Sequence, residues 1–331
     1  MRSCGKLPSK IQWGGDEKLY LLHRSFNSGN PGIPSNNGLN VSRGEYILFI
    51  DNDDFITKTA LEELYPIAKK FDADVVHCEK YFEFIDGQNS FKLESYQKGE
   101  FVKEPTLLTK DLAQRTVELN NKRFLFNLWT KLIRRDYLLF NDIKMISGMA
   151  QDALFTFCLL VSAKNYVRVP NVVNFYRVVE DSLSHKKQNI VSKIHQWFNA
   201  MVIGFQYFEN FLSEREFFQK RPDAKYVALE AWVRECLNYL QETYKTIPAF
   251  QLDEIIRHEF SKVHDKTGLM AFLFSRMNVF NVNLNHQGAM IQQMNAYIQK
   301  ANAHIQQQNN FIKQQQEQIK QLQAQLNSDR E

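Results

Sequence analysis

The sequence predicts an α/β fold that is followed by helices. A strand, an acidic loop, a helix and a second strand follow one another over residues 46–78, the repeating unit of sheets with helical crossovers. From about residue 186 the strand signals fade, and aromatic residues recur at helical spacing. From about residue 284 a seven-residue repeat of aliphatic side chains begins. We therefore expect three regions, over residues 1–185, 186–283 and 284–331.

The most informative stretch is an apolar run that ends in carboxylates. Residues 46–50 favour β structure and predict a buried strand, and Asp51, Asp53 and Asp54 follow where it ends. In open α/β sheets, ligands bind at this end of a strand. Crowded carboxylates repel one another unless a cation offsets their charge, and their hard oxygens suit Mg²⁺ or Mn²⁺. A solvated turn after the strand is the alternative interpretation.

The elements after the acidic loop complete a parallel α/β unit. Thr57 is a suitable N-cap for a helix over 58–70, and residues 73–78 predict a short buried strand. Aromatic residues around Asp86-Gly87 suggest a hairpin over 81–101. The remaining pattern predicts a strand over 19–23, helices over 109–120 and 154–160, and strands over 166–169 and 172–176.

Four separate motifs resemble those of the family 2 glycosyltransferases of the GT-A fold. The first runs from Asn36 to Asp54 and matches the pattern N-x-G-L before G-E-Y-x-x-F-x-D-x-D-D. The second is W-x-K-L-I-R-R over 129–135, and the third is Q-D-x-x-F over 151–155, where the family has E-D-x-x-F. The fourth is Y-R followed by S-x-S over 176–184. Their order matches that of the family over about residues 18–185, which makes the combined signal specific.

The resemblance implies a GT-A-like, Rossmann-like mixed sheet that is incomplete at the N-terminus. The family begins with a strand of the V-S-V-I-I-P type and a second strand that ends in D-D-G-S-x-D. Neither segment stands before Asp16, so we expect this chain to enter the fold at its third strand. A helical subdomain and a C-terminal coiled coil are expected to follow.

The resemblance also implies an activity and the residues of the donor side. Family members transfer a sugar from a nucleotide-diphosphate donor to a hydroxyl acceptor with inversion, in bacterial surface polysaccharide or glycolipid synthesis. Asp53 and Asp54 would hold Mn²⁺ or Mg²⁺, which offsets charge on the leaving diphosphate. Asn36, Gly38 and Asp51 would contact the donor.

The later motifs supply the base and the acceptor side by the same resemblance. Asp152 matches the general base and stands beside Gln151, where Glu is usual; a helix cap is its alternative assignment. Trp129 and Lys131 would line the acceptor side, or else form a core Trp beside an exposed Lys. His185 is a further candidate ligand of the metal or the diphosphate.

Composition narrows the partners and the compartment. A net charge of +4 with scattered basic residues does not indicate nucleic-acid binding. The four cysteines show no C-x-x-C spacing, which fits a reducing compartment without a disulfide framework or a cysteine zinc site. We find no apolar stretch of membrane-spanning length and no signal peptide. We expect a cytoplasmic protein, with peripheral attachment to the inner membrane face as an open alternative, that takes a nucleotide-sugar donor and a saccharide or lipid-linked saccharide acceptor.

The tail predicts self-association. Aliphatic residues recur at every seventh position without a miss: Leu284, Ile291, Ile298, Ile305, Ile312, Ile319 and Leu326. This spacing is the signature of a Gln-rich coiled coil, and so of a homo-oligomer. A single long helix, or disorder that folds on association, is the alternative.

Two other functions are compatible with the sequence. The chain could be a catalytically inactive remnant that serves as a coiled-coil oligomerisation or scaffold protein. It could also be a metal-dependent nucleotidyl- or phosphotransferase that uses the same acidic loop.

Overall fold

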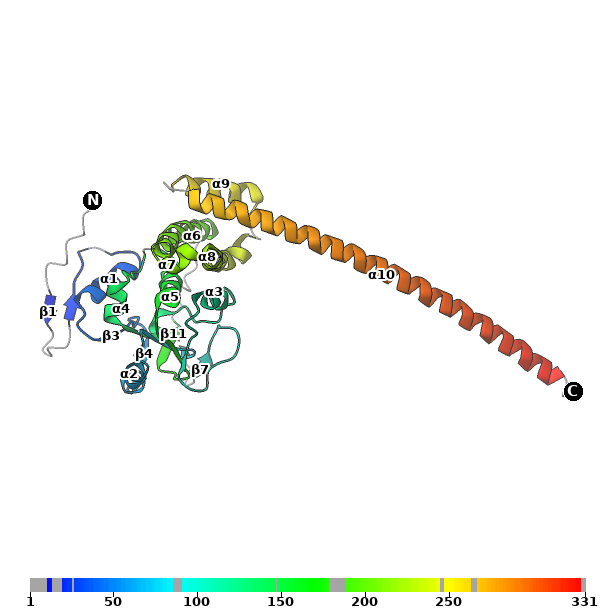
Figure 1. Cartoon of the computed structure of the whole chain (residues 1–331), viewed down its shortest axis with the longest axis horizontal. Coiled ribbons are helices and arrows are strands. Elements are labelled where there is room, and N and C mark those ends of the chain that lie inside the picture. Colours follow the sequence, from blue (N-terminus) through cyan, green and yellow to red (C-terminus); the bar gives the residue numbers. More distant parts are fainter. Residues whose placement is uncertain are drawn as a thin grey trace. The chain divides into compact units, whose positions relative to one another are not determined.

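The computed structural model describes residues 11–13, 20–25, 27–85, 91–146, 148–178, 189–244, 247–262 and 267–328. The chain forms two compact units, Met1–Leu269 and Met270–Glu331 (Figure 1). The first unit contains the sheets and helices α1 to α9, and the second consists of most of the long helix α10.

The described strands form three sheets. A five-stranded sheet has the order β3-β9-β5-β10-β8, a four-stranded sheet has the order β4-β11-β6-β7, and β1 pairs with β2. The strands are β1 (Ile11–Trp13), β2 (Tyr20–Leu22), β3 (Tyr46–Leu48), β4 (Phe55–Ile56), β5 (Val75–Cys78), β6 (Tyr81–Ile85), β7 (Phe91–Glu94), β8 (Thr106–Leu107), β9 (Lys131–Arg134), β10 (Tyr166–Val169) and β11 (Asn174–Val178).

Most of the described helical residues lie in the second half of the chain. They are α1 (Gly32–Val41), α2 (Ala60–Lys70), α3 (Leu112–Asn120), the 3-10 turn η1 (Leu128–Thr130), α4 (Arg135–Phe140), α5 (Gln151–Ser162), α6 (Ile190–Ser213), α7 (Glu216–Lys220), α8 (Pro222–Tyr244), α9 (Ala249–Ser261) and α10 (Thr267–Ser328). The predicted mixed α/β architecture followed by helices is confirmed.

The five-stranded sheet corrects the predicted parallel unit. Strands β3 and β5 run in the same direction, but β9 lies between them and pairs antiparallel with both. Strand β9 comes from the W-x-K-L segment, for which we predicted no strand. Strand β3 is therefore an edge strand; it is half-buried and ends at Leu48, short of the predicted Ile50. A parallel pair does occur, between β5 and β10.

Helices cover both faces of the five-stranded sheet. Leu64 and Ala68 of α2 pack against Val76 of β5 and Leu132 of β9 on one face. Helix α5 lies on the opposite side from α2 in Figure 1, and all but two of its residues are buried. This double coverage explains why β5 is buried along its whole length. Three of its four residues are apolar, and His77 is the polar one.

Helix α2 begins later than predicted. Its N-cap is Thr59, whose hydroxyl bonds Glu63 at 2.6 Å, so the assignment of the cap to Thr57 is wrong. The backbone N–H of Thr57 donates instead to the Val173 carbonyl at 2.8 Å, while its own carbonyl accepts from Ala60 at 3.2 Å. The residue is held as a link between β4 and the start of β11 rather than as a cap.

The predicted hairpin is confirmed as β6 and β7, which pair antiparallel. Its turn, residues 86–90, lies outside the described residues. Strand β6 also pairs in parallel with β11, and β11 pairs with β4, which directly follows the acidic loop. The four-stranded sheet therefore ties the acidic loop to residues more than a hundred positions later.

The helical region has the aromatic core that its spacing predicts. The aromatic and aliphatic residues that we predicted to recur are all buried: Ile194, Trp197, Phe198, Met201, Phe205 and Phe208. Helix α6 packs against α8 so closely that a Cβ added to Gly204 would lie 2.2 Å from Trp232 Cζ2. Cys78, Cys158 and Cys236 are buried free thiols.

The tail is a single helix in the structure. Ile291, Ile298, Ile305 and Ile312 are each about half exposed on α10. Association through this stripe remains a prediction. None of the described helices combines the length and the apolar character that crossing a bilayer requires.

Candidate functional site

The acidic loop connects β3 to β4 and forms a turn. The backbone N–H of Asp54 donates to the Asp51 carbonyl at 3.1 Å, and the Asp54 carboxylate accepts from the Arg177 backbone N–H at 2.9 Å. Burial, together with the charges of Asp51 and Asp53, raises the pKa of Asp54 to about 6, although the hydrogen bond from Arg177 opposes the rise. Burial also raises the pKa of Asp51, and the charge of Asp53 adds to that rise. The loop is thus a place where negative charge is crowded and partly removed from water.

Asp152 lies in the first turn of α5 and close to this loop. Burial raises the pKa of its carboxyl to about 6, and the charge of Asp51 is the second cause. Lys131 and a hydrogen bond from the Leu128 backbone N–H oppose the rise. The fold therefore brings together two acids that the sequence places far apart. A carboxyl group with a pKa near neutrality is suited to accept a proton in catalysis.

The segment before Asp152 is conformationally constrained. Ala150, the N-cap of α5, has φ of 57° and ψ of 21°, in the left-handed region that an alanine seldom adopts. Gly148 also has a positive φ, of 130°. Strained backbone of this kind persists where its surroundings force it, and it is concentrated at functional sites. Here it sets the direction in which α5 presents Asp152.

Gly32 supports this segment, and the sequence analysis missed it. A Cβ at Gly32 would lie 2.6 Å from Gln151 Oε1 and 2.8 Å from the Ile146 carbonyl oxygen. Helix α1 can approach so closely because position 32 carries no side chain. The glycine of the predicted motif is different, since a Cβ at Gly38 would meet nothing within 4 Å. The N-x-G pattern marked Gly38 as a donor contact, which stays a prediction, whereas no motif marked the tightly packed Gly32.

Asn36 holds the same segment from the other end. Its side-chain amide donates to the Met145 carbonyl at 2.8 Å and accepts from the Met145 N–H at 2.9 Å. These two bonds join α1 to the chain that leads into α5. The cavity beside Asn36 has a volume of about 30 Å³, which is room for a single water molecule rather than a nucleotide. This geometry favours a positioning contribution for Asn36.

Lys131 is fully buried on β9. Its ammonium group donates to the carbonyls of Leu125 and Asn127 at 2.8 and 2.6 Å, and to the Thr130 hydroxyl at 3.1 Å. Burial lowers the pKa of Lys131 to about 7, and the charge of Asp152 opposes the lowering. The cation thus ties down the loop before β9 and faces Asp152 electrostatically, without reaching the surface.

Aromatic rings stand beside the acidic loop. Trp129 stacks on Tyr176 with ring centroids 5.9 Å apart and meets Tyr81 edge to face at 5.0 Å. Burial raises the pKa of Tyr176, and the charges of Asp54 and Asp53 add to this rise, so the phenol lies near the acids. Trp129 itself is only 5% exposed. We did not single out Tyr81 from the sequence, since nothing local marks it.

One predicted ligand cannot be placed. His185 and the S-x-S residues 182–184 lie outside the described residues. The described sites that are brought together are therefore the acidic loop, Asp152, Lys131 and the Trp129–Tyr176 pair.

The side chains of the acidic loop could act as ligands of a hard divalent cation. Carboxylate oxygens suit Mg²⁺ and Mn²⁺, and the raised pKa values show that positive charge would be favourable there. Among the described residues, however, these acids do not form a group of three with ligand atoms within 4.8 Å of one another. Such loops hold Mg²⁺ through one or two carboxylates together with water and substrate phosphates.

Comparison with known proteins identifies residues 9–138 of the chain. Residues 9–138 match the family model "Glycosyl transferase family 2". This part of the chain belongs to glycosyltransferase family 2. The match covers the acidic loop and β9 and ends in α4, so Asp152 lies beyond it.

Several bacterial family members resemble this chain over part of their length. The poly(ribitol-phosphate) β-N-acetylglucosaminyltransferase TarP of Staphylococcus aureus is 31% identical over 157 residues, which is 47% of this chain and 43% of TarP. The cholesterol galactosyltransferase of Borreliella burgdorferi is 28% identical over 169 residues, 48% of this chain and 46% of that protein. The chain therefore spans less than half the length of either relative.

A solved structure supports the fold. The crystal structure of S. aureus TarS 1-349 in complex with UDP-GlcNAc aligns with a TM-score of 0.53 at 19% identity, over 71% of this chain and 61% of that one. At this identity the likeness concerns the GT-A-like architecture, and it confirms the predicted fold class.

Proposed function

We propose that this protein transfers a sugar from a nucleotide-diphosphate donor to a hydroxyl acceptor. The observation that carries the proposal is the nearness of Asp152 to the acidic loop of the family 2 region. The two acids come from distant parts of the chain, yet the charge of one raises the pKa of the other. A solvated turn would not require such an arrangement.

Each required step has a candidate in the described residues. Asp152 would take the proton of the acceptor hydroxyl, because its carboxyl is partly removed from water and has a pKa near neutrality. Lys131, itself buried, would keep the charge of Asp152 in balance and fix the loop that carries Trp129. Tyr176 is half-buried and stacks on the buried Trp129, so its ring is the flat surface near the acids on which a sugar ring could lie.

The proposed donor side is the acidic loop. Asp53 and Asp54 would hold Mn²⁺ or Mg²⁺ together with the diphosphate, and the cation would neutralise the leaving group. The charge of Asp51 interacts with both Asp53 and Asp152, so Asp51 is near enough to both to orient the donor. Asn36 and Gly38 of α1 are further proposed donor contacts, and His185 stays a proposed further ligand.

The proposal is tested by binding of UDP and UDP-GlcNAc, the latter because TarS has been crystallised with it. Calorimetry with and without Mn²⁺ on the full chain should show Mn²⁺-dependent binding that Asp53→Ala and Asp54→Ala abolish. Asp253→Ala, an exposed acid on α9 paired with Arg257, is the control and should bind normally. Undiminished binding by both loop variants would refute the assignment.

The wider context is also proposed. The relatives' names support transfer in bacterial surface polysaccharide or glycolipid synthesis, and the family resemblance supports inversion and a cytoplasmic site, with a peripheral position at the membrane as the alternative. Product analysis by NMR would reveal the anomeric configuration. A retained configuration would refute inversion.

We further propose that α10 associates as a homo-oligomeric coiled coil. Its isoleucines lie about half exposed at heptad spacing, and a lone helix leaves that stripe in water. Sedimentation of the full chain should give a mass above that of the monomer. Ile298→Asn combined with Ile305→Asn should return the monomer, and a monomeric wild type would refute the proposal.

A further inference from the structure

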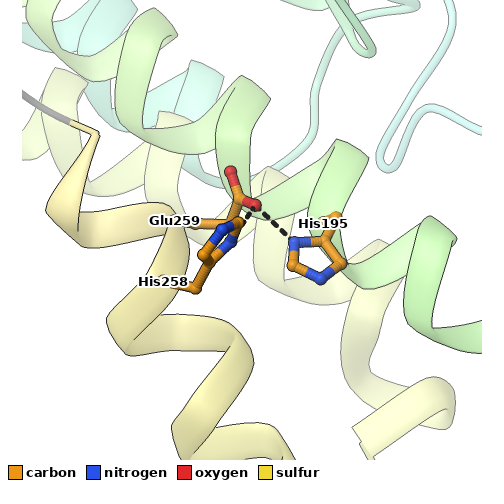
Figure 2. A group of neighbouring side chains, drawn as sticks. All are labelled: His195, His258 and Glu259. Carbon is orange, nitrogen blue, oxygen red and sulfur yellow. Dashed lines mark hydrogen bonds and ion pairs between the residues drawn. The ribbon is translucent and has the colours of Figure 1, made fainter.

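Two helices of the first unit bring two histidines and a glutamate together. His195 of α6 and His258 of α9 both direct their Nδ1 atoms at the same Oε1 atom of Glu259 (Figure 2). The His258 contact is 3.2 Å, and the His195 contact is a closer ion pair. One ligand atom from each residue lies within 4.8 Å of the others.

The backbone beneath this cluster is held by packing. Ile194, Trp197 and Ile255 form a buried apolar cluster between α6 and α9. His195 directly follows the first of these residues, and Glu259 stands one helical turn after the last. The positions of two of the three side chains are therefore set by elements that have few alternatives, which is a requirement for a preorganised site.

Burial and exposure divide the cluster in a way that suits an ion. The Glu259 side chain is only 4% exposed, so its charge needs a positive partner. The two imidazoles are accessible, with 32% and 60% of the His195 and His258 side chains exposed, so an ion can enter between them. The buried oxygen supplies charge and the open side leaves room for a water ligand.

We propose that His195, His258 and Glu259 bind a transition-metal ion, Zn²⁺ in the first place. Two imidazole nitrogens and one carboxylate oxygen are the ligand set of open tetrahedral zinc sites, whose fourth position is taken by water. Ligands held at about 2 Å from such an ion lie roughly 3.3 Å apart. The cluster therefore needs only a small rearrangement: the His195 ring must move slightly away from Oε1, and the exposed His258 can adjust its position to the ion.

Lys262 competes for the same site. Its ammonium group lies 2.8 Å from Glu259 Oε1, on the atom that the ion would bind. The side chain is about half exposed and can swing into water when an ion enters. Removal of this side chain should therefore preserve or increase metal affinity. A cluster that exists only as an ion-pair network would instead gain no metal affinity from that change.

The bound ion would join α9 to α6 close to the segment that presents Asp152. Met149 and Ala150 pack against the same apolar cluster of α6 and α9. An ion bound here would therefore also fix the packing of α9 on α6.

The experiment is equilibrium dialysis of the full chain against Zn²⁺ near neutral pH, with Mg²⁺ in excess to saturate oxygen-only sites. Wild type should bind one Zn²⁺ per chain, and Zn²⁺ should raise its melting temperature. His258→Gln, at an exposed position that should not disturb folding, should weaken binding at least about tenfold, as should His195→Gln and Glu259→Gln.

Two matched variants complete the test. His304→Gln, on the exposed face of α10, should bind Zn²⁺ as wild type does. Lys262→Met should bind at least as tightly as wild type. Absence of Zn²⁺ binding by wild type, or equal binding by His258→Gln and wild type, would overturn the proposal. Neither result bears on sugar transfer, which is tested separately through the acidic loop.

Discussion

The acidic loop and the histidine cluster are built in opposite ways. The acids come from a loop and from the start of α5, are crowded electrostatically, and do not converge on one point. The histidines and Glu259 come from two packed helices and already converge on a single oxygen. A site of the first kind is completed by its substrate, whereas one of the second kind needs only an ion. Hence the acidic site should lose its function when the chemistry of a side chain changes, whereas the histidine site should lose its function when the packing of its helices changes.

The largest effect is expected at Asp152, where chemistry alone changes. Asp152→Asn keeps the shape but cannot accept a proton, so turnover should fall by about 10²–10⁴-fold. Donor affinity measured by calorimetry should be unchanged. Asp253→Asn on α9 is the control. Normal turnover by the Asp152 variant would rule out the base and leave the loop as a binding site only.

The second-largest effect is expected at Gly32, which packs against the segment that leads to Asp152. Gly32→Ala places a Cβ 2.8 Å from the Ile146 carbonyl, so the chain leading to Asp152 must shift. A shift of this kind can reduce turnover by up to about 100-fold. Gly288→Ala on α10 meets no atoms and lies outside the proposed site, so it should leave turnover unchanged. Steady-state kinetics of the pair checks this, and equal rates would show that the close approach at Gly32 is irrelevant.

In the helical region, the third prediction tests the packing of α6 against α8. Gly204→Ala would bring a Cβ within 2.2 Å of Trp232, whose indole is fixed by a 3.0 Å hydrogen bond to the Met201 carbonyl. The free energy of unfolding should fall by about 1–3 kcal/mol in urea titrations. Gly288→Ala on α10 meets open space and should be neutral or stabilising by up to about 1 kcal/mol. A stable Gly204 variant would mean that α6 and α8 can separate at little cost.

The smallest effect concerns His77, which differs from the exposed cluster histidines. Its ring is completely buried and bonds the Tyr166 hydroxyl at 2.9 Å, and burial holds its pKa well below the ordinary value. Below about pH 6.5 the unfolded chain binds a proton that the folded chain does not, so this group lowers stability as pH falls.

The measurement is the unfolding free energy of wild type and His77→Gln over a pH series. Their difference should change by about 1.4 kcal/mol per pH unit below about pH 6.5 and be constant above it. Asp54 and Asp152, with raised pKa values, act in the opposite direction, and the subtraction cancels them. A difference that does not vary with pH would show that His77 takes up its proton in the folded state.

Local pattern was sufficient where a segment's structure depends on its own residues. The apolar run before Asp51, the helix that ends at Lys70 and the hairpin of β6 and β7 all occur as predicted, within a few residues. The aromatic spacing after residue 190 correctly placed those side chains in a core. Periodicity reports which face of an element is buried, and this is a property of the sequence itself.

The sequence did not predict which distant segments pair with one another. Nothing local says that β9 enters between β3 and β5, because any apolar strand can fill that position. For the same reason the sequence could not predict that Lys131 is buried. Nor could it predict that the side-chain amide of Asn36 bonds to the backbone of Met145. These assignments depend on what lies opposite each side chain.

The sequence by itself determined the order of elements, the acids at a strand end and the family to which residues 9–138 belong. Only the tertiary structure decided that Asp152 meets those acids, that Gly32 rather than Gly38 is packed tightly, and that His195 reaches Glu259. The physical reason is that spacing along a chain sets direction and burial, whereas distance in space follows from long-range packing, which no short segment encodes.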